Sequence, residues 1–381
     1  MKPYVPSWHD SEVSALSELA TGFFEREVIA NNPKWDAQRR IDRSVWLAAG
    51  NLGLLLCSIP EEYGGGGGTF AHDLAVFEAQ GYSGDLSLGI AVHSGIVAHY
   101  IAEYGSEQQK RQWLPAMASG EVLAAIGMTE PGAGSDLKAI KTTATERGGE
   151  YVVNGSKTFI TNGSSADMIL LAVKTDPRAG ARGVSLLIVD LRDCDGFAVG
   201  RVLDKVGQHG ADTSELSFTD VVVPAGNVLG RPGEGFGQMM TQLVQERLII
   251  GAQAAGAMKR AVEETIRYTR SREAFGHSLF EFQNTAFELA ECQTIARTCE
   301  VFLDHCIRSH LRGELDAAEA AMVKYWLTDT QCEVVDRLVQ LHGGYGYMRE
   351  YLIARMYEDA RVQRIYAGAN EVMKSIIAKA L

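Results

Sequence analysis

Apolar residues recur at helical spacing through the first 120 residues of the chain. In Val13–Ile29, Trp35–Ala49 and Gln108–Ala118 they fall three or four positions apart, a pattern typical of amphipathic helices. Between these segments lies Gly64–Gly68, a run of five glycines. No Lys followed by Ser or Thr comes after this run, so we interpret it as a flexible turn rather than a phosphate-binding loop. Residues 1–120 are therefore predicted to form an N-terminal helical domain.

From residue 121 to about residue 230 the pattern changes to short runs rich in β-branched and aromatic residues. Tyr151–Val153 precedes Asn154-Gly155, and Phe159–Thr161 precedes Asn162-Gly163; both dipeptides favour hairpin turns. The series continues with the predicted strands Met168–Val173, Val184–Val189, Glu215–Phe218 and Val221–Val223. No helical segment separates these strands and no G-x-G-x-x-G follows one. We therefore expect an antiparallel β-barrel in residues 121–230 and no Rossmann cofactor site.

Helical spacing returns from residue 231 onward. Gly237–Tyr268, Phe282–Leu311 and Ala317–His342 are long periodic segments, and their lengths suit a bundle of about four helices. The predicted fold is therefore α+β. It has an N-terminal helical domain, a central antiparallel β-barrel domain, and a C-terminal four-helix bundle over residues 231–381.

Charge and hydropathy exclude several classes of partner. The formal net charge is −12, which disfavours nucleic acids and anionic membranes because both require a basic surface. No apolar run approaches the roughly 18 residues of a membrane span, so none is expected. The first residues, MKPYVPSWHDSEVSAL, lack the basic and apolar regions of a signal peptide.

The six cysteines include no C-x-x-C pair. Cys292, Cys299 and Cys306 recur every seven residues, which places them along one helix face. We interpret them as small apolar core residues rather than, with His305 nearby, a metal site. This cysteine usage fits a reduced, cytoplasmic location, and no metal is expected.

Two glycine-rich segments carry the candidate chemistry. Gly127–Ala139, reading GMTEPGAGSDLKA, is a predicted loop whose backbone N–H groups can face an anion or a flat ring. Gln340–Glu371 opens with a Gly-Gly-Tyr-Gly turn, continues as a helix in which Arg355 and Asp359 are spaced to pair, and breaks at Ala367-Gly368-Ala369. Together they resemble the two signatures of the acyl-CoA dehydrogenase family. The likeness extends over nearly the whole chain and is closest to the long-chain and isovaleryl branches.

This resemblance implies an FAD cofactor between the barrel and the bundle. It assigns the flavin cradle to Ile126, Gly127, Met128, Thr129, Gly134 and Ser135, and a second flavin wall to Phe159, Ile160 and Thr161. It assigns the pyrophosphate and adenosine end to Arg272, Phe275, Gln283, Gln340, Leu341, His342, Gly343 and Gly344 of a neighbouring subunit. Further cofactor contacts are implied for Ala369, Asn370 and Glu371. An Arg suits pyrophosphate because its planar fork donates two hydrogen bonds at once.

The same resemblance bears on the catalytic base. Where many family members carry a catalytic glutamate, this chain has Ala367. Glu246 lies in a helical run beside Leu248 and Ile249, apolar neighbours that disfavour its ionised form. The long-chain and isovaleryl branches carry their base at the matching position, so we expect Glu246 to be a relocated base; a catalytically inactive chain is the alternative. The substrate-binding residues implied are Ser135, Val244, Gln245, Glu246, Arg247, Ala367 and Gly368.

The expected reaction is the FAD-dependent dehydrogenation of a saturated acyl-CoA, as in fatty-acid β-oxidation. Glu246 would remove the pro-R α-proton, and the β-hydride would pass to flavin N5 to give the trans-2-enoyl-CoA. The family likeness also implies a homotetramer and an electron-transfer flavoprotein as electron acceptor. An acyl-CoA oxidase is a weaker alternative because such enzymes usually carry a large additional C-terminal domain. A non-catalytic or partner-dependent acyl-CoA/FAD-binding subunit of a mixed assembly is disfavoured because Arg272, Gln283, Gln340 and Glu246 are all present.

Overall fold

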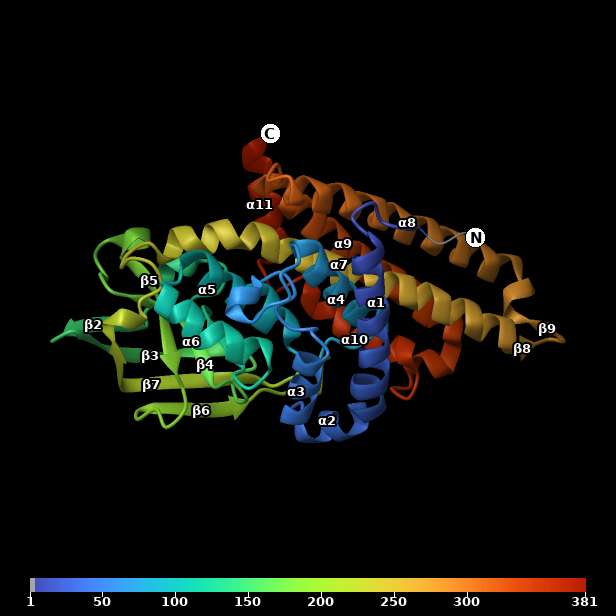
Figure 1. Ribbon diagram of the computed structural model, residues 1–381. Coiled ribbons are helices and arrows are strands. Elements are labelled where there is room, and N and C mark those ends of the chain that lie inside the picture. Colours follow the sequence, from blue (N-terminus) through green and yellow to red (C-terminus); the bar gives the residue numbers. More distant parts are fainter. Residues whose placement is uncertain (1–3) are drawn as a thin grey trace.

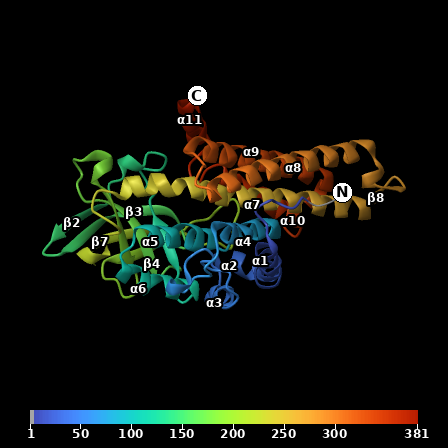
Figure 2. The same ribbon diagram turned by 45° about the horizontal axis from the view of Figure 1, so that its top comes forward.

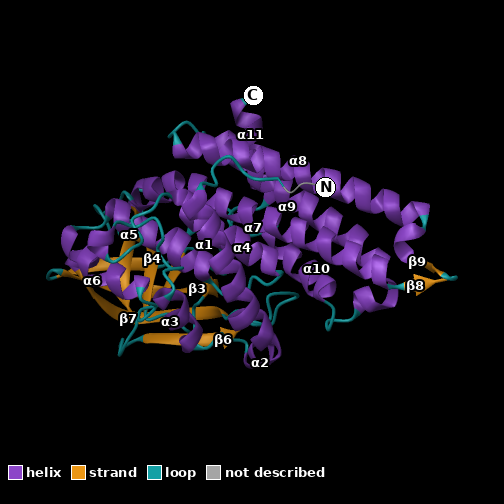
Figure 3. Cartoon of the chain, turned by 45° about the vertical axis from the view of Figure 1, so that its right-hand side comes forward, coloured by secondary structure: helices purple, strands orange, loops and turns teal. Residues whose placement is uncertain are grey.

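The computed structural model describes residues 4–381, which follow the predicted order of helices, strands and helices (Figure 1). The strands of the central domain gather at one end, the long C-terminal helices extend to the other, and the N-terminal helices pack at the junction (Figures 1 and 2). Figure 3 shows the same separation of strands and helices from another side. Within residues 4–381, no helix has the length and apolar character needed to cross a membrane.

Helices dominate the N-terminal domain. They are α1 (Ser11–Phe23), α2 (Asn32–Gln38), α3 (Arg43–Asn51), α4 (Phe70–Ser83), α5 (Ala98–Tyr104) and α6 (Glu107–Ala118), with a π-helical segment at Ala91–Val97. The single helix predicted over Trp35–Ala49 is wrong, because Arg39 takes a left-handed φ of 53° and ends α2. The turn at Gly64–Gly68 is closely packed rather than flexible. A Cβ atom on Gly65 would lie only 2.1 Å from the carbonyl oxygen of Ile59.

One sheet forms the central domain. Its strands are β1 (Ala124–Gly127), β2 (Thr143–Arg147), β3 (Glu150–Thr161), β4 (Met168–Lys174), β5 (Val184–Asp190), β6 (Phe197–Val202) and β7 (Thr213–Pro224). Their order is β1-β4-β2-β3-β7-β6, with β5 paired to β4. Most pairs are antiparallel, as predicted, but β4 runs parallel to both β1 and β2, so the sheet is mixed. The two strands predicted at Glu215–Phe218 and Val221–Val223 are one continuous strand, β7.

Neither predicted hairpin turn joins two paired strands. Asn154-Gly155 lies inside β3, where the register against β7 shifts between Val153 and Gly155. This is a bulge, and glycine is required there because a Cβ atom would lie 2.4 Å from the hydroxyl of Thr142. Asn162-Gly163 follows β3, but the next strand, β4, pairs with other neighbours. The hairpin that does form joins β2 to β3 through Gly148-Gly149, whose φ angles are 63° and 89°.

β4 connects the two hydrophobic cores of the molecule, since alternate residues of a strand point to opposite faces. Its even-numbered residues face the core shared with the helices, and its odd-numbered residues face the core inside the sheet domain. The first set is Met168, Leu170 and Ala172, and the second is Ile169, Leu171 and Val173. β4 therefore helps to fix the sheet against the helical domains, and the neighbouring β5 alternates between the same two cores.

The C-terminal domain is built on one long helix, α7, which runs from the sheet to the far end of the molecule (Figure 1). Its elements are α7 (Gly235–Ser271), β8 (Glu273–Ala274), β9 (His277–Ser278), α8 (Gln283–Leu311), α9 (Ala317–His342), α10 (Leu352–Gln363) and α11 (Asn370–Ala380). Cys292, Cys299 and Cys306 are confirmed as core residues, each with 0% of its surface exposed. Across residues 4–381, no group of three or more His, Cys, Asp or Glu is placed to hold a metal ion.

Arg355 on α10 ties the C-terminal domain to the N-terminal one. The predicted ion pair with Asp359 does not form, because two carboxylates from other elements bind the guanidinium instead. Asp36 on α2 lies 2.5 Å from Arg355, and Asp85, just after α4, lies 3.1 Å from it. Asp359 accepts a hydrogen bond from the backbone N–H of Gln208. The ion pairs of Arg355 therefore hold two domains together rather than stabilise a single helix.

Candidate active site

A cavity of about 520 Å³ lies where the three domains meet. Its walls come from the π-helical segment before α5, from α7, from the sheet domain and from the connection between α10 and α11. The apolar lining consists mainly of Leu86, Leu88, Ala91, Val92, Ile96, Phe236, Met240, Leu243, Ile249 and Ile250. The polar lining includes Thr129, Ser135, Thr161, Gln208, Glu246 and Arg247. A mostly apolar hollow with a few polar groups suits a small-molecule ligand with a hydrophobic part.

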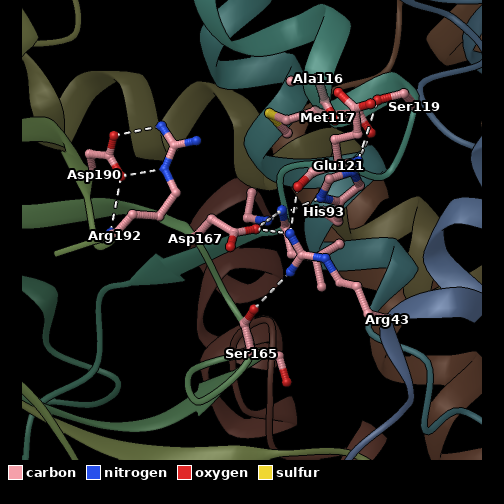
Figure 4. Close-up of polar contacts among 12 residues, drawn as sticks. Arg43, His93, Ala116, Met117, Ser119, Glu121, Ser165, Asp167, Asp190 and Arg192 are labelled. Atoms are coloured by element: carbon pink, nitrogen blue, oxygen red, sulfur yellow. Dashed lines mark hydrogen bonds and ion pairs between the residues drawn. The ribbon is translucent and has the colours of Figure 1, made fainter.

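A polar junction holds two of these walls together (Figure 4). His93 in the π-helical segment accepts the N–H of Ala124 in β1 at 3.2 Å, and its other ring nitrogen bonds the carbonyl oxygen of Met117 at 3.0 Å. This pattern requires a neutral ring, and burial lowers the pKa of His93 to about 4. Nearby, Arg43 bonds the carboxylate of Asp167, which precedes β4. The π-helical segment and the sheet are thereby held in a fixed relation.

Glu246 is the buried carboxyl group of the cavity. It lies on α7 and lines the cavity, yet only 5% of its surface is exposed. Burial raises its pKa from 4.5 to about 7, while the hydroxyl of Tyr100 and the charge of Arg247 oppose the shift. The Tyr100 hydroxyl donates a hydrogen bond to Glu246 Oε1 at 3.1 Å. The carboxyl group is therefore positioned and poised to exchange a proton near neutral pH.

Two other carboxyl groups have a pKa raised to about 7, namely Glu78 and Asp359, and burial is the main cause in both. Neither lines the cavity. Arg247, next to Glu246, does line it, and its Nη1 donates to the carbonyl oxygen of Ala317 at 3.2 Å. Both adjacent residues thus face the cavity, one as a buried acid and one as a buried cation.

The raised pKa of Glu246 has a consequence for stability. Its protonated form is favoured by folding, so this contribution is complete below pH 4.5 and is lost as the pH rises through about 7. We expect Glu246→Gln to melt at a higher temperature than the wild type at pH 8.5. The free-energy difference should be roughly 3 kcal/mol or less and should vanish near pH 5. Thermal unfolding at several pH values measures this difference. Glu264→Gln, a substitution on the same helix, is the control, and its difference from the wild type should not grow between about pH 5 and about pH 8.5.

The sheet domain contributes the loop Gly127–Ala139. Glu130 is buried and shapes this loop, because its carboxylate accepts the backbone N–H groups of Lys141 at 2.6 Å and Thr142 at 3.0 Å. Lys157 on β3 reaches the same carboxylate at 2.8 Å. With its glutamate held inside, the loop turns Thr129, Gly134 and Ser135 toward the cavity.

Phe159, Ile160 and Thr161 form a second part of the sheet wall. Phe159 takes a left-handed φ of 59° and leaves 66% of its surface exposed. An exposed aromatic ring on strained backbone is typical of a ligand site. Within the Gly127–Ala139 loop, Gly132 and Gly134 leave open space where a Cβ atom would stand. These features fit the flat, partly apolar ring system of a flavin.

The connection between α10 and α11 forms the wall that contains Ala367 and Gly368. Their φ angles are 50° and 90°, so both residues are held in left-handed conformations. The buried Lys324 on α9 donates to the carbonyl oxygen of Gly368 at 2.7 Å and to Asn370 Oδ1 at 2.8 Å. Ala369, Asn370 and Glu371 do not line the cavity. The Asn370 side chain is taken up by Lys324, Thr328 and Asp329 inside the bundle, not by the cofactor space.

A second depression, of about 450 Å³, lies at the other end of α7. Its lining includes the predicted cofactor residues Arg272, Gln340, Leu341, His342, Gly343 and Gly344. The predicted residues Phe275 and Gln283 are exposed nearby but do not line it. The Arg272 guanidinium lies 5.6 Å from the centre of the Tyr345 ring. This open, glycine-lined surface carries the planar guanidinium of Arg272, whose N–H donors suit a phosphate-bearing group.

The two depressions are far apart within one chain. Arg272 caps α7 and stands 26 residues beyond Glu246 on the same helix, which at 1.5 Å per residue is about 39 Å. This distance exceeds the length of one FAD molecule. A single cofactor therefore cannot touch both sites unless the second site comes from another subunit.

Several predicted site residues lie outside the cavity, and several lining residues were not predicted. Gly127, Val244 and Gln245 do not line it, and the Gln245 side chain instead donates to the carbonyl oxygen of Gly95 at 3.4 Å. The lining residues that the sequence did not indicate include Leu88, Val92, Gln208, Phe236, Met240 and Tyr366. Most are ordinary apolar residues, and only the folded arrangement of distant segments brings them together.

The π-helical segment approaches α7 so closely that a glycine is needed. A Cβ atom on Gly95 would lie 2.6 Å from Ile249 Cδ1 and 2.8 Å from the ring of Phe77. We expect Gly95→Ala to lower the free energy of unfolding by about 1–3 kcal/mol, because the buried neighbours must move. Gly226→Ala is the matched control, since no atom lies within 4 Å of its Cβ position. Equal melting temperatures for the two variants would show that the segment is not tightly packed.

Residues 10–121, 125–221 and 233–381 match, in turn, the N-terminal, middle and C-terminal domains of acyl-CoA dehydrogenase. The chain is 43% identical over 371 residues to the mitochondrial long-chain specific acyl-CoA dehydrogenase of Sus scrofa, covering 97% of this chain and 86% of that protein. The crystal structure of an acyl-CoA dehydrogenase from Geobacillus kaustophilus is similar with a TM-score of 0.96 and 44% identity, over 99% of both chains. An acyl-CoA dehydrogenase from Bacillus anthracis complexed with FAD is similar with a TM-score of 0.92 and 31% identity, over 99% of this chain and 68% of that one.

The three domain matches and the likeness to an FAD-bound acyl-CoA dehydrogenase identify an FAD-dependent oxidoreductase. The chain belongs to the acyl-CoA dehydrogenase family. The predicted family, fold class, enzyme class and FAD cofactor are therefore confirmed.

Proposed function

We propose that this protein converts a saturated acyl-CoA to the trans-2-enoyl-CoA in an FAD-dependent reaction, with Glu246 as the base that removes the α-proton. The placement of Glu246 is the observation that supports this proposal most strongly. Its carboxyl group is buried, lines the cavity and has a pKa of about 7. Such a base combines a useful fraction of carboxylate at neutral pH with a high affinity for the proton.

In the proposed step, the C–H bond at the α carbon breaks and the proton joins a carboxylate oxygen of Glu246. Burial favours the protonated form that results. The electron pair left at the α carbon forms the C=C bond as the β-hydrogen departs with its own pair. When bound, FAD supplies the acceptor for that hydride at flavin N5. The products are the enoyl-CoA, the protonated Glu246 and the reduced cofactor.

The thioester carbonyl would be bound on the wall opposite Glu246. We assign this role to the backbone N–H of Ala367, because an N–H directed at the carbonyl oxygen stabilises negative charge as it develops. Ala367 and Gly368 both take left-handed conformations and line the cavity, which supports this assignment. Lys324 holds the wall from behind through its bond to the Gly368 carbonyl oxygen. The missing glutamate at position 367 is thus compatible with a working site.

The apolar part of the cavity suits the acyl chain. Leu88, Val92 and Ile249 lie on the walls formed before α5 and by α7, where a hydrocarbon chain loses contact with water. Ser135 and Lys138 lie on the sheet side of the same cavity, where polar groups can meet the CoA portion. The substrate-binding roles of Ser135, Arg247, Ala367 and Gly368 are part of this proposal.

The proposed active unit is a homotetramer in which neighbouring subunits complete each FAD site. The separation of about 39 Å between Glu246 and Arg272 along α7 supports this. A subunit that binds but does not catalyse is disfavoured, because Glu246 lines one depression and Arg272 the other in the same chain. We further propose an electron-transfer flavoprotein as the electron acceptor and fatty-acid β-oxidation as the setting. The cytoplasmic location stays a prediction.

Anaerobic titration of the FAD-containing protein with acyl-CoA thioesters of graded length and branching tests this function. We expect the oxidised flavin band to bleach with at least one acyl-CoA, and one enoyl-CoA to form per flavin reduced. The substrate that bleaches the flavin fastest would identify the acyl group preferred. An FAD-loaded protein that no acyl-CoA bleaches would contradict the proposal.

A further inference from the structure

Tyr100 contacts Glu246 from behind the cavity wall. It lies on α5, has 0% of its surface exposed and does not line the cavity. Its hydroxyl donates to Glu246 Oε1 at 3.1 Å. Within residues 4–381, this is the only hydrogen bond that the Glu246 carboxyl group receives. Tyr100 is therefore placed to act on the carboxyl group without touching a ligand.

The fold fixes the distance between these two residues through the segment that precedes α5. Gly95 packs directly against Ile249 on α7, where any side chain would collide. Its carbonyl oxygen accepts a hydrogen bond from Gln245, the residue before Glu246. Two successive residues of α7 are thus bonded to this segment and to α5, one through Gly95 and one through Tyr100.

The π-helical turn at Ala91–Val97 contributes to this alignment. Its hydrogen bonding runs from residue i to i+5, as seen where the N–H of Ala98 donates to the carbonyl oxygen of His93. The extra residue in such a turn rotates all following side chains by about 100° relative to a continuous α-helix. Val92 can therefore line the cavity while Tyr100, further along the same run, reaches Glu246. Helical bulges of this kind occur often at functional sites.

The bond to one carboxylate oxygen has two chemical effects. It restricts the side-chain rotation of Glu246, while no donor among residues 4–381 bonds the second oxygen, Oε2. It also favours the ionised form, since a hydroxyl donates more strongly to a carboxylate than to a carboxylic acid. The other charged and titratable groups near this pair are Arg247 on α7 and Tyr104 on α5, and Lys324 on α9 lies near Arg247. Among residues 4–381, only Tyr100 donates a hydrogen bond directly to the Glu246 carboxyl group.

We propose that Tyr100 is a positioning residue that orients the Glu246 carboxylate so that Oε2 faces the α carbon of the substrate. This inference rests on the proposed function, because it gives Glu246 the role of base. Nothing in the motifs of the sequence indicates Tyr100, which lies in a helix outside both glycine-rich segments.

Tyr100→Phe tests the proposal, because it removes the hydroxyl and keeps the ring. Tyr104→Phe is the matched control; Tyr104 lies one helical turn further along α5, and its ring centre is 6.3 Å from that of Tyr100. Both variants are prepared as FAD-loaded proteins, and their FAD content and melting temperature are compared first. Two readouts follow: the pH dependence of kcat/KM, and infrared titration of the carboxyl group in protein labelled with ¹³C-glutamate. The band of Glu246 is assigned by its loss in Glu246→Gln.

We expect Tyr100→Phe to raise the midpoint of the infrared titration of Glu246 by roughly one pH unit. The midpoint on the acidic side of the pH profile of kcat/KM should move to higher pH by the same amount. Below that midpoint, kcat/KM should fall about tenfold with little change in KM. Tyr104→Phe should follow the wild type in both readouts.

Identical titrations in the two variants and the wild type would overturn the proposal and leave Tyr100 a packing residue. A shifted infrared midpoint with an unchanged pH profile would also overturn it, but for a different reason. The contact would then be real and Glu246 would not be the base, so the proposed function itself would need revision. Failure of the inference and failure of the proposed base are therefore distinguishable.

Discussion

Glu246→Gln is expected to lower the rate of flavin reduction by acyl-CoA at least 100-fold, because the substitution removes the proposed base. Binding of FAD and of acyl-CoA should persist. Glutamine has the shape of glutamate, and its oxygen can still accept the hydrogen bond that Tyr100 donates to Glu246. Stopped-flow mixing under anaerobic conditions measures the reduction rate, and the perturbation of the flavin spectrum by acyl-CoA measures binding.

Glu78→Gln is the matched control for this prediction. Glu78 is a partly buried glutamate whose pKa is also raised to about 7, but it lies on α4 and does not line the cavity. Its variant should reduce flavin at the wild-type rate. Equal losses in the two variants would mean that a carboxyl group with a raised pKa affects activity through the fold wherever it lies, and would remove the case for Glu246 as base.

A chain with Arg272→Glu and a chain with Glu246→Gln are each expected to be inactive alone. We expect activity to return when the two kinds of chain assemble into one oligomer. Alone, Arg272→Glu should weaken FAD binding by roughly two orders of magnitude, because a phosphate-binding guanidinium is replaced by a carboxylate. Alone, Glu246→Gln should bind FAD and remain inactive. In a mixed oligomer, one site combines Glu246 of the first chain with Arg272 of the second. That site is intact, so about half of the wild-type activity per pair should return.

Co-expression with two different affinity tags, followed by purification on both, isolates the mixed oligomers for this test. Arg267→Glu is the control. Arg267 lies on α7 and pairs with Glu264 at 3.0 Å, but it does not line the second depression, so this variant should bind FAD normally. Mixed oligomers that remain inactive would contradict the sharing of sites between neighbouring subunits.

The gross architecture could be predicted from the sequence because its signals are local. Helical spacing over Phe282–Leu311 and Ala317–His342 corresponds to two long helices, α8 and α9. The errors arose where tertiary contacts override local patterns. Asn154-Gly155 has the composition of a hairpin turn, yet it forms a bulge because its glycine packs against Thr142.

The site could be predicted only where a motif or a family resemblance indicated it. Glu246 and Ala367 both line the cavity, as do Thr129 and Phe159. The roles assigned to them stay predictions. Residues such as Val92 carry no chemical signal, because apolar side chains line cavities and cores alike. Tyr100 belongs to the same group, since its partner lies 146 positions away in the sequence and only the fold joins them.

The raised pKa of Glu246 links the structure of this site to its chemistry. The same burial that makes the carboxylate a stronger base also costs stability once the group ionises, as the pKa of about 7 shows. The single bond from Tyr100 offsets part of that cost. In the proposed mechanism, the environment of Glu246 therefore makes the carboxylate more basic at a limited cost in the stability of the fold.

Exchange of the α-proton with solvent tests the role of Glu246 most directly. The FAD-loaded protein is incubated anaerobically in D₂O with the acyl-CoA that bleaches the flavin fastest, and deuterium in the recovered acyl-CoA is measured by mass spectrometry. We predict that the wild type and Glu78→Gln incorporate deuterium at the α carbon, and that Glu246→Gln incorporates none on the same timescale. Exchange by Glu246→Gln at the wild-type rate would show that another group takes the proton.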